Sequence, residues 1–261
     1  MTYSNLALIT GASGGIGAEF ARIHAEKGGD MVLVARSEDK LNELKTELES
    51  RYGVNVIVLA EDLGKPGAAS RVFEFTESQN MQVEVLINNA GFGGHGKFVE
   101  RDIEADKAMI QLNVTALTEL THAYLKGMVE RRSGKVLNVS STASFIPGPL
   151  QAVYYATKAF VTSFSQAIAE EVSEYNVSVT ALCPGPVDTG FVKAGDLDKV
   201  DVWKNAKSAR SVAEVGYRDM MGKELLSFNE GMLKFAINWV FPLLPRKQVL
   251  KASRKSMEKS H

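Results

Sequence analysis

The chain has 261 residues, of which 45% are hydrophobic and 23% charged, a composition that provides a sizeable core and excludes a disordered or fibrous protein. Its 30 basic and 31 acidic residues give a net charge of −1, so the charge offers no reason to expect nucleic acid as a partner. The balance is uneven, because six basic residues and one acidic residue give residues 246–261 a net charge of +5.

Cys183 is the single cysteine, which rules out an intrachain disulfide and favours a reducing compartment. The first residues lack the basic start and long apolar run of a secretory signal peptide. The longest strongly apolar stretch, residues 235–245, is eleven residues long and contains Asn238 and Pro242. A membrane-spanning helix needs about 20 apolar residues. We therefore expect a cytoplasmic protein without a transmembrane segment.

Short apolar, β-branched runs alternate with segments of helical periodicity up to about residue 185. The apolar runs have the pattern of buried parallel strands and cover residues 6–10, 31–35, 55–60, 85–88, 135–140 and 178–182. Helical periodicity falls near residues 15–28, 38–52, 66–80, 101–131 and 152–175. This alternation predicts a single α/β domain over residues 1–261, a Rossmann-type doubly wound parallel sheet with helices on both faces. Ligands of such sheets bind outside the carboxyl ends of the strands.

The chain is less regular after the sixth predicted strand. Residues 186–230 are more polar, and we expect a substrate-facing loop there with one or two short helices. A helix and an apolar run follow near residues 230–244, and a basic tail, residues 246–261, ends the chain. Apolar aromatics followed by cations are typical of membrane-surface segments, so residues 235–261 are a candidate for peripheral membrane contact. The simpler alternative, a last helix packed on the core or on a subunit with a solvated tail, is favoured.

A glycine-rich turn, TGASGGIG from Thr10 to Gly17, connects the first predicted strand to the first predicted helix. Its glycines at positions 11, 15 and 17 allow a sharp turn and a close approach of the backbone to a ligand. The helix start adds unpaired N–H groups and the positive end of the helix dipole, which suit a pyrophosphate. A tight connection without a ligand would use the same glycines, but the strand before and the helix after favour dinucleotide binding.

The end of the second strand selects between nicotinamide cofactors, because a carboxylate there binds a ribose 2′-hydroxyl and repels a 2′-phosphate. Arg36 occupies this position, with Ser37 as a second donor. A guanidinium pairs bidentately with phosphate, so Arg36 favours NADP(H) over NAD(H); the alternative is an ordinary surface arginine. Asp62 ends the third strand, where its carboxylate could accept from an adenine amino group or cap the next helix.

Tyr154 and Lys158 lie four residues apart in a predicted helix and so share one face of it. An unperturbed tyrosine has a pKa near 10, and a nearby ammonium would lower that pKa towards neutral and make the phenol a better base. Such a pair is common by chance, and its weight comes from the features around it. Ser141 follows the fifth strand, and Asn113 lies inside a long helix, where an amide needs a partner.

Together these motifs resemble those of the short-chain dehydrogenase/reductase family in its NADP(H)-preferring form. They follow one another as TGxxxGxG, NNAG, Asn113, Ser141, YxxxK and a PG turn, over about residues 5–190. The resemblance implies an oxidoreductase that interconverts a carbonyl and an alcohol by hydride transfer, and it implies a homodimer or homotetramer. The alternative is a cofactor-binding sensor or scaffold without turnover, which would not need the complete Asn, Ser, Tyr and Lys set.

The resemblance also assigns roles to single residues. Tyr154 would exchange a proton with the substrate oxygen, and Ser141 would hold that oxygen in an oxyanion-hole role. Lys158 would lower the pKa of Tyr154 and bind the nicotinamide ribose, and Asn113 would open a helical hydrogen bond to water and complete a proton relay. The residues implied to line the cofactor site are Gly11, Ser13, Gly15, Ile16, Gly17, Arg36, Asp62, Leu63, Asn89, Ala90, Lys158, Pro184, Gly185, Val187 and Thr189.

The histidines at positions 24, 95, 122 and 261 show no metal-ligand spacing, so no metal is expected. His95, in a glycine-rich segment after the NNAG motif, is the one that could reach a substrate. Apolar residues near Ser141 and Tyr154 could wall a pocket: Phe92, Phe145, Ile146, Pro147, Phe191 and Trp203. Loop packing explains them equally well. If they line a pocket, the substrate is a small molecule with an apolar body, of the ketone, ketosteroid or ketoacyl type.

Overall fold

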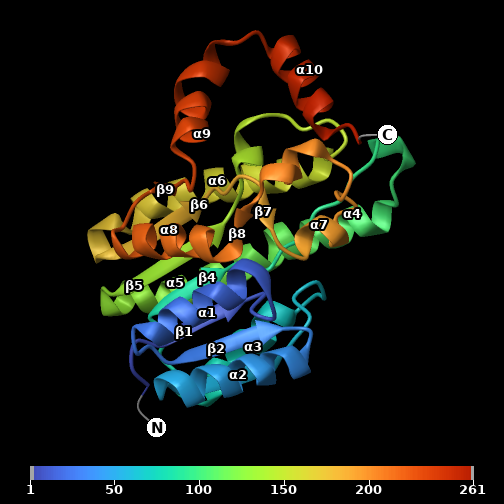
Figure 1. The fold of residues 1–261 in the computed structure, drawn as a ribbon. Helices are drawn as coiled ribbons and strands as arrows, with labels where there is room; N and C mark the ends of the chain where they lie inside the picture. Colours follow the sequence, from blue (N-terminus) through green and yellow to red (C-terminus); the bar gives the residue numbers. More distant parts are fainter. Residues whose placement is uncertain (1–2, 260–261) are drawn as a thin grey trace.

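The computed structural model describes residues 3–259, so the last two positions of the predicted tail, Ser260 and His261, lie outside the described residues. Its strands are β1 (Ala7–Thr10), β2 (Met31–Ala35), β3 (Val56–Ala60), β4 (Val85–Asn88), β5 (Gly134–Val139), β6 (Val177–Leu182), β7 (Val187–Asp188), β8 (Lys207–Ser208) and β9 (Leu226–Ser227). Seven of them form a parallel sheet in the order β3-β2-β1-β4-β5-β6-β9 (Figure 1). The predicted doubly wound sheet is confirmed. The strand order reverses between β1 and β4, the switch point at which such sheets bind ligands.

Helices cover both faces of the sheet. They are α1 (Gly15–Glu26), α2 (Glu38–Tyr52), α3 (Ala68–Ser78), α4 (Ile103–Ile110), α5 (Leu117–Arg131), α6 (Ala152–Val172), α7 (Phe191–Ala194), α8 (Ala209–Met221), α9 (Gly231–Phe235) and α10 (Arg246–Met257). Side chains of α1, α2 and α8 join one hydrophobic core, and those of α3, α5 and α6 join the other. Neighbouring residues of one strand pack into different cores: Ile9 packs into the first core and Leu8 into the second. Strands buried on both faces therefore need continuous apolar runs.

The long helix predicted over residues 101–131 is present in three parts. Between α4 and α5, the backbone of Gln111–Ala116 forms a π-helical segment that contains Asn113. A π segment replaces the usual i to i−4 hydrogen bonds by wider ones, and such segments are frequent at functional sites. The disturbance of the helix expected at Asn113 is thus observed, and its position opposite the end of β4 is fixed by tertiary contacts described below.

The segment 186–230, predicted as a substrate loop, divides into two parts. All residues of this segment that line the main cavity lie in its first part, up to Trp203. Its second part contains α8, a core helix whose buried Val212, Ala213, Tyr217 and Met220 pack against the sheet and α1. Their helical spacing puts these side chains on one face, which explains the burial. Strand β9 follows and is too short to produce a readable pattern.

The C-terminal residues form an arch above the rest of the molecule (Figure 1). Residues 231–243 rise through α9, a π-helical segment (Ala236–Val240) and a 3₁₀ turn (Phe241–Leu243), and α10 returns to the body. The predicted basic tail is therefore mostly helical, with Val249, Ser253 and Met257 turned inward. Within residues 3–259, no helix has both the length and the hydrophobicity needed to cross a membrane.

His24 makes the stability of this fold pH-dependent. It is buried in α1, with one ring nitrogen 2.9 Å from the Tyr217 hydroxyl and the other 2.8 Å from the Asn5 carbonyl oxygen. Burial lowers the pKa of His24 below its ordinary value, so folding favours the neutral ring. This stabilisation is complete above the unfolded pKa, about 6.5, and is lost as the pH falls below it. We expect the free energy of unfolding to decrease from about pH 7 to about pH 5 in urea titrations.

The His24→Gln variant should lose this part of the pH dependence, whereas His122→Gln, at an exposed position, should keep it. Equal slopes of unfolding free energy against pH in His24→Gln and the wild type would contradict the assignment.

Candidate active site

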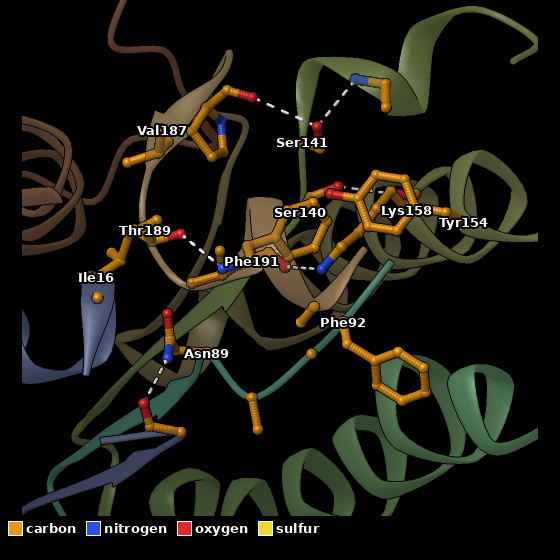
Figure 2. Close-up of a pocket in the computed structure, with 18 of the residues that line it drawn as sticks. Ile16, Asn89, Phe92, Ser140, Ser141, Tyr154, Lys158, Val187, Thr189 and Phe191 are labelled. Carbon is orange, nitrogen blue, oxygen red and sulfur yellow. Dashed lines mark hydrogen bonds between the residues drawn. The ribbon is translucent and has the colours of Figure 1, made fainter. Parts of the chain in front are cut away.

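A cavity of about 930 Å³ lies beyond the carboxyl ends of the strands, at the switch point of the sheet. The predicted cofactor and catalytic residues all line it except two, Gly17 and Asn113. Figure 2 shows Ser141, Tyr154 and Lys158 on one side of this space, with Phe191 near them and Thr189 and Ile16 on the other side. One cavity thus joins the glycine-rich turn to the proposed catalytic side chains.

Thr10 and Asn89 hold the glycine-rich turn against the turn that follows β4. The Thr10 hydroxyl accepts hydrogen bonds from the backbone N–H groups of Asn89 (2.9 Å) and Ala90 (3.0 Å). In return, the Asn89 side-chain amide donates to the carbonyl oxygens of Thr10 (3.0 Å) and Gly11 (3.3 Å). These bonds fix the distance between the two turns, because each turn satisfies polar groups of the other.

The glycines of the turn serve two different purposes. Gly11 has a φ of +66° and Gly15 a φ of +56°, conformations that favour glycine. Gly17 is not at the cavity: a Cβ there would overlap the Gly11 carbonyl oxygen and the Asn89 amide. Gly17 therefore serves the close packing of α1 beneath the turn, and its contact with a cofactor stays a prediction.

The end of the cavity at β2 carries unneutralised positive charge. Arg36 is exposed and forms no ion pair with any residue of the described chain, and Lys40, one turn further along α2, lines the same end. Glu61 also lines it, but its carboxylate is paired with Arg71 at 2.9 Å. Lys40 was not singled out from the sequence, although its spacing of four residues from Arg36 places both on one side of the start of α2.

Asp62 does not cap the next helix, because the N-cap of α3 is Gly67, and its contact with an adenine stays a prediction. One oxygen of its carboxylate accepts a hydrogen bond from the backbone N–H of Gly64 at 3.1 Å, so it closes a turn after β3. The residue also lines the cavity, next to Leu63.

Two hydrogen bonds fasten α6 to the end of β5. The buried ammonium of Lys158 donates to the Val139 carbonyl oxygen at 2.8 Å. The Ser140 hydroxyl donates to the Lys158 carbonyl oxygen at 2.9 Å and lies 2.6 Å from the Thr162 hydroxyl. These contacts set the position of Lys158 and, one turn before it, of Tyr154 relative to the strand end.

Tyr154 is buried at the base of the cavity, with the Phe191 ring 5.3 Å away between centroids. In the protein alone, burial raises the pKa of Tyr154 above its ordinary value, and a contact with Ser141 offsets only part of this effect. Burial likewise lowers the pKa of Lys158 from 10.5 to about 8. The lowering of the Tyr154 pKa expected from Lys158 is not present in the protein alone: desolvation is the largest cause of the shift, and the ammonium lies 5.8 Å from the ring centroid.

Ser141 is held loosely. Its hydroxyl oxygen accepts from the Ala143 backbone N–H at 3.1 Å, and its hydroxyl donates to the Pro184 carbonyl at 3.4 Å (Figure 2). The second bond is long and weak, so a better acceptor in the cavity can replace it.

Asn113 acts from behind the cavity rather than within it. Its side-chain oxygen accepts from the Phe92 backbone N–H at 3.1 Å, and its amide donates to the Phe92 carbonyl at 2.9 Å and to the Thr157 hydroxyl at 3.2 Å. The hydroxyl of Thr157 donates to the Tyr154 carbonyl at 2.7 Å. The Asn113 side chain therefore joins the π segment, the turn after β4 and helix α6. The relay to water through an opened helical hydrogen bond stays a prediction.

The far end of the cavity is apolar. Of the six predicted wall residues, four line it: Phe92, Ile146, Phe191 and Trp203. Phe145 packs on Phe228 instead, and Pro147 does not line the cavity. His95 is also outside the lining, because its ring binds the Met257 carbonyl oxygen at 2.7 Å.

Sequence reasoning missed the part of the wall that comes from the C-terminal arch. Leu233, Ile237, Phe241 and Met257 line the cavity, together with Gln151 and Ser256. The first three are spaced four residues apart, which is the signal of one helix face.

The residues present fit a nicotinamide dinucleotide. Gly14 lines the cavity at the start of α1, and a Cβ there would meet no atom within 4 Å, so open space suited to a pyrophosphate lies beside the helix N-terminus. Arg36 and Lys40 offer positive charge at one end of the cavity. Among residues 3–259, no group of three or more His, Cys, Asp or Glu side chains could hold a metal ion.

The chain is similar to known dehydrogenases and reductases along most of its length. Residues 5–199 match the family model for short chain dehydrogenase. The very-long-chain 3-oxoacyl-CoA reductase of Laccaria bicolor is 38% identical over 67% of this chain and 53% of its own. The match therefore spans about half of that relative's length.

Two solved structures share the fold over nearly the whole chain. A short-chain dehydrogenase from Sphingobium yanoikuyae in complex with NADPH is 30% identical, covers 93% of this chain and 96% of its own, and superposes with a TM-score of 0.82. A 7β-hydroxysteroid dehydrogenase structure is 28% identical, with coverages of 96% and 97% and a TM-score of 0.86.

The Thr10 hydroxyl is expected to be needed for both stability and cofactor binding. Thr10→Val leaves the backbone N–H groups of Asn89 and Ala90 without their acceptor, which should reduce the free energy of unfolding by about 2 kcal/mol. We also expect about a tenfold weaker nicotinamide dinucleotide affinity, because the two turns lose their fixed distance. Urea unfolding and fluorescence titration measure the two effects. Thr10→Ser keeps the hydroxyl and should behave as wild type; equal losses in both variants would contradict the role.

Proposed function

The chain belongs to the short-chain dehydrogenase family, and we propose that it is an NADP(H)-dependent oxidoreductase that interconverts a carbonyl and an alcohol. The observation that carries the proposal is the placing of Ser141, Tyr154 and Lys158 in the same cavity as the glycine-rich turn. A protein that only binds a cofactor has no need of a phenol, a hydroxyl and an ammonium beside one another at the far side of that site.

The preference for NADP(H) rests on the charge at the end of β2. Arg36 and Lys40 line the cavity there, and the carboxylate of Glu61, which also lines it, is paired with Arg71. Two cations attract a 2′-phosphate, and a guanidinium binds it bidentately. The NADPH complex of the Sphingobium yanoikuyae relative supports the same preference.

The bound nicotinamide would give hydride to the substrate carbon, or take it in the reverse direction. In reduction, Tyr154 donates its phenolic proton to the carbonyl oxygen, and in oxidation it accepts that proton. Ser141 donates a hydrogen bond to the same oxygen and stabilises the negative charge that develops on it, after giving up its long bond to Pro184.

Lys158 supports the proton transfer by its charge. In the protein alone, burial opposes ionisation of both Tyr154 and Lys158. Acceptor hydroxyls of a cofactor ribose beside Nζ, and positive charge on an oxidised nicotinamide, would favour the ammonium and the phenolate together. The hydrogen bond from Lys158 to the Val139 carbonyl keeps the ammonium at this place. Asn113 is a positioning residue, since it reaches Tyr154 through Thr157.

The substrate has an apolar body. Phe92, Phe191 and Trp203 form one wall of the cavity beyond Tyr154, and Leu233, Ile237 and Phe241 form another. Such walls favour a ketone, ketosteroid or ketoacyl compound over a small charged one, because apolar surface is removed from water on binding. The names of the similar proteins, a 3-oxoacyl-CoA reductase and a hydroxysteroid dehydrogenase, lie within this class.

Tyr154→Phe is expected to reduce turnover at least about 1,000-fold, because it removes the proton donor and leaves the ring in place. Cofactor affinity should change less than about threefold, since the hydroxyl is not needed to hold the dinucleotide. NADPH oxidation with a panel of ketones, aldehydes, ketosteroids and ketoacyl thioesters measures the first effect, and fluorescence titration measures the second.

Phe160→Tyr is the matched control. Phe160 is in the same helix but is partly exposed and does not line the cavity, so a hydroxyl at this position cannot replace that of Tyr154. Retention of most of the activity in Tyr154→Phe would contradict the role of Tyr154. Absence of activity in the wild type over the whole panel, with tight NADPH binding, would favour the sensor or scaffold.

Arg36→Asp should shift the cofactor preference towards NAD(H). The carboxylate repels a 2′-phosphate and can accept from a 2′-hydroxyl, so kcat/KM for NADPH should fall about 100-fold relative to that for NADH. Arg36→Gln removes the charge without reversing it and should give a smaller shift. An unchanged ratio of the two kcat/KM values in Arg36→Asp would contradict the assignment.

A further inference from the structure

The C-terminal arch, residues 231–257, is apolar on two opposite faces. Its inner face contributes Leu233, Ile237 and Phe241 to the wall of the cavity. Its outer face carries Met232, Phe235, Trp239 and Leu243, whose exposed fractions are 90%, 62%, 68% and 83%. A segment that only closed a pocket would place polar residues outside, as amphipathic helices do.

Exposed large apolar side chains are more concentrated here than elsewhere on the molecule. Half of the large hydrophobic side chains exposed in the described chain lie between Met232 and Leu250. Figure 1 shows that this segment stands away from the sheet and its helices, with the turn between α9 and α10 as its outermost point. Contiguous exposed apolar surface of this kind marks a site of contact with a partner or a membrane.

The returning helix α10 adds positive charge to the same arch. Arg246, Lys247, Lys251 and Lys255 are exposed, and none forms an ion pair with a residue in the range 3–259. Val249, Ser253 and Met257 of α10 are buried, whereas these four cations are exposed to solvent. The single acid at its end, Glu258, is paired with Arg254 at 3.4 Å.

The arch is fastened to the body at its far end. Met257 packs with Leu197 and Val200, and its carbonyl oxygen binds His95 at 2.7 Å. Lys259 forms an ion pair with Asp196 at 2.6 Å. These contacts tie the arch over the cavity and fix which of its faces points outward.

We propose that the outer face of the arch docks on an anionic lipid bilayer and that apolar substrate passes from the bilayer into the cavity beneath. Large apolar side chains with Trp239 among them suit the boundary between headgroups and acyl chains, and unpaired cations on α10 suit anionic headgroups. The passage of substrate rests on the proposed function, whereas the docking does not.

A second copy of the chain is a less favourable occupant of this face. A symmetric dimer places the same patch on both sides of the contact, so two copies of the cationic α10 would approach each other. Anionic lipid supplies the opposite charge, which Arg246, Lys247, Lys251 and Lys255 do not find in an ion pair within residues 3–259.

The test compares two double variants in vesicle co-sedimentation. Leu243→Ser/Lys251→Glu changes the arch, and Val99→Ser/Lys126→Glu makes equivalent changes elsewhere on the surface, Val99 being 87% exposed. We expect the wild type and the control to bind vesicles of phosphatidylglycerol and phosphatidylcholine, and to bind pure phosphatidylcholine much less. The arch variant should bind the anionic vesicles at least about tenfold more weakly, and salt at about 0.5 M should weaken the wild type.

Both variants should reduce a water-soluble ketone at the wild-type rate, because neither arch residue lines the cavity. With a long-chain ketone embedded in the anionic vesicles, the arch variant alone should be slower. Equal vesicle binding by both variants, or no binding by the wild type, would overturn the docking. A dimer of the wild type that the arch variant dissolves in sedimentation velocity, without vesicle binding, would assign the face to a second copy. A protein that binds vesicles but reduces no ketone would keep the docking and remove the proposed function.

Discussion

The site depends on one buried charge, the ammonium of Lys158, and on the carbonyl that receives it. Val139 is the last residue of β5, so its carbonyl oxygen points out of the sheet edge towards the cavity, and Lys158 binds it from α6. An ammonium taken out of water needs such partners, and burial already lowers its pKa to about 8. The same helix turn carries Tyr154, and the same strand end carries Ser140 and Ser141. The two bonds between α6 and the end of β5 therefore place Ser141, Tyr154 and Lys158 relative to one another.

The other half of the site follows from the same geometry at the neighbouring strands. Parallel strands β1 and β4 end at the same edge, where the Thr10 hydroxyl binds the backbone after β4 and Asn89 binds the glycine turn. Asn113 then ties the turn after β4 to α6 through Phe92 and Thr157. The two turns and the catalytic helix form one hydrogen-bonded unit, so the cofactor end and the reactive end of the cavity are held at a fixed separation.

Sequence reasoning succeeded for residues whose role follows from their chemical type and from their position at the end of a strand. Arg36 and Ser141 line the cavity because parallel strands deliver their carboxyl ends to one edge, which periodicity predicts. It could not predict what tertiary packing decides. Gly17 reads like the other glycines of the turn, but only the position of the Gly11 carbonyl shows that it packs beneath the turn. The burial of α8 was readable from its helical stripe, whereas β9 has only two residues and pairs with β6 because α8 places it there.

The near-zero net charge of the chain is the sum of a negative body and a positive C-terminal segment, which the fold keeps apart. The body, residues 1–245, carries about six negative charges more than positive ones, and the chain after it carries +5. Folding does not cancel the two within the described residues: Lys259 pairs with Asp196 of the body and Arg254 with Glu258, but the other four cations of α10 are exposed and form no ion pair there. Unpaired positive charges at a distance from a negatively charged body give the molecule a dipole. This dipole orients the positive and apolar arch towards an anionic surface. Because the inner face of that arch is also the wall of the cavity, the orientation of the protein and the access to its site are set by the same residues.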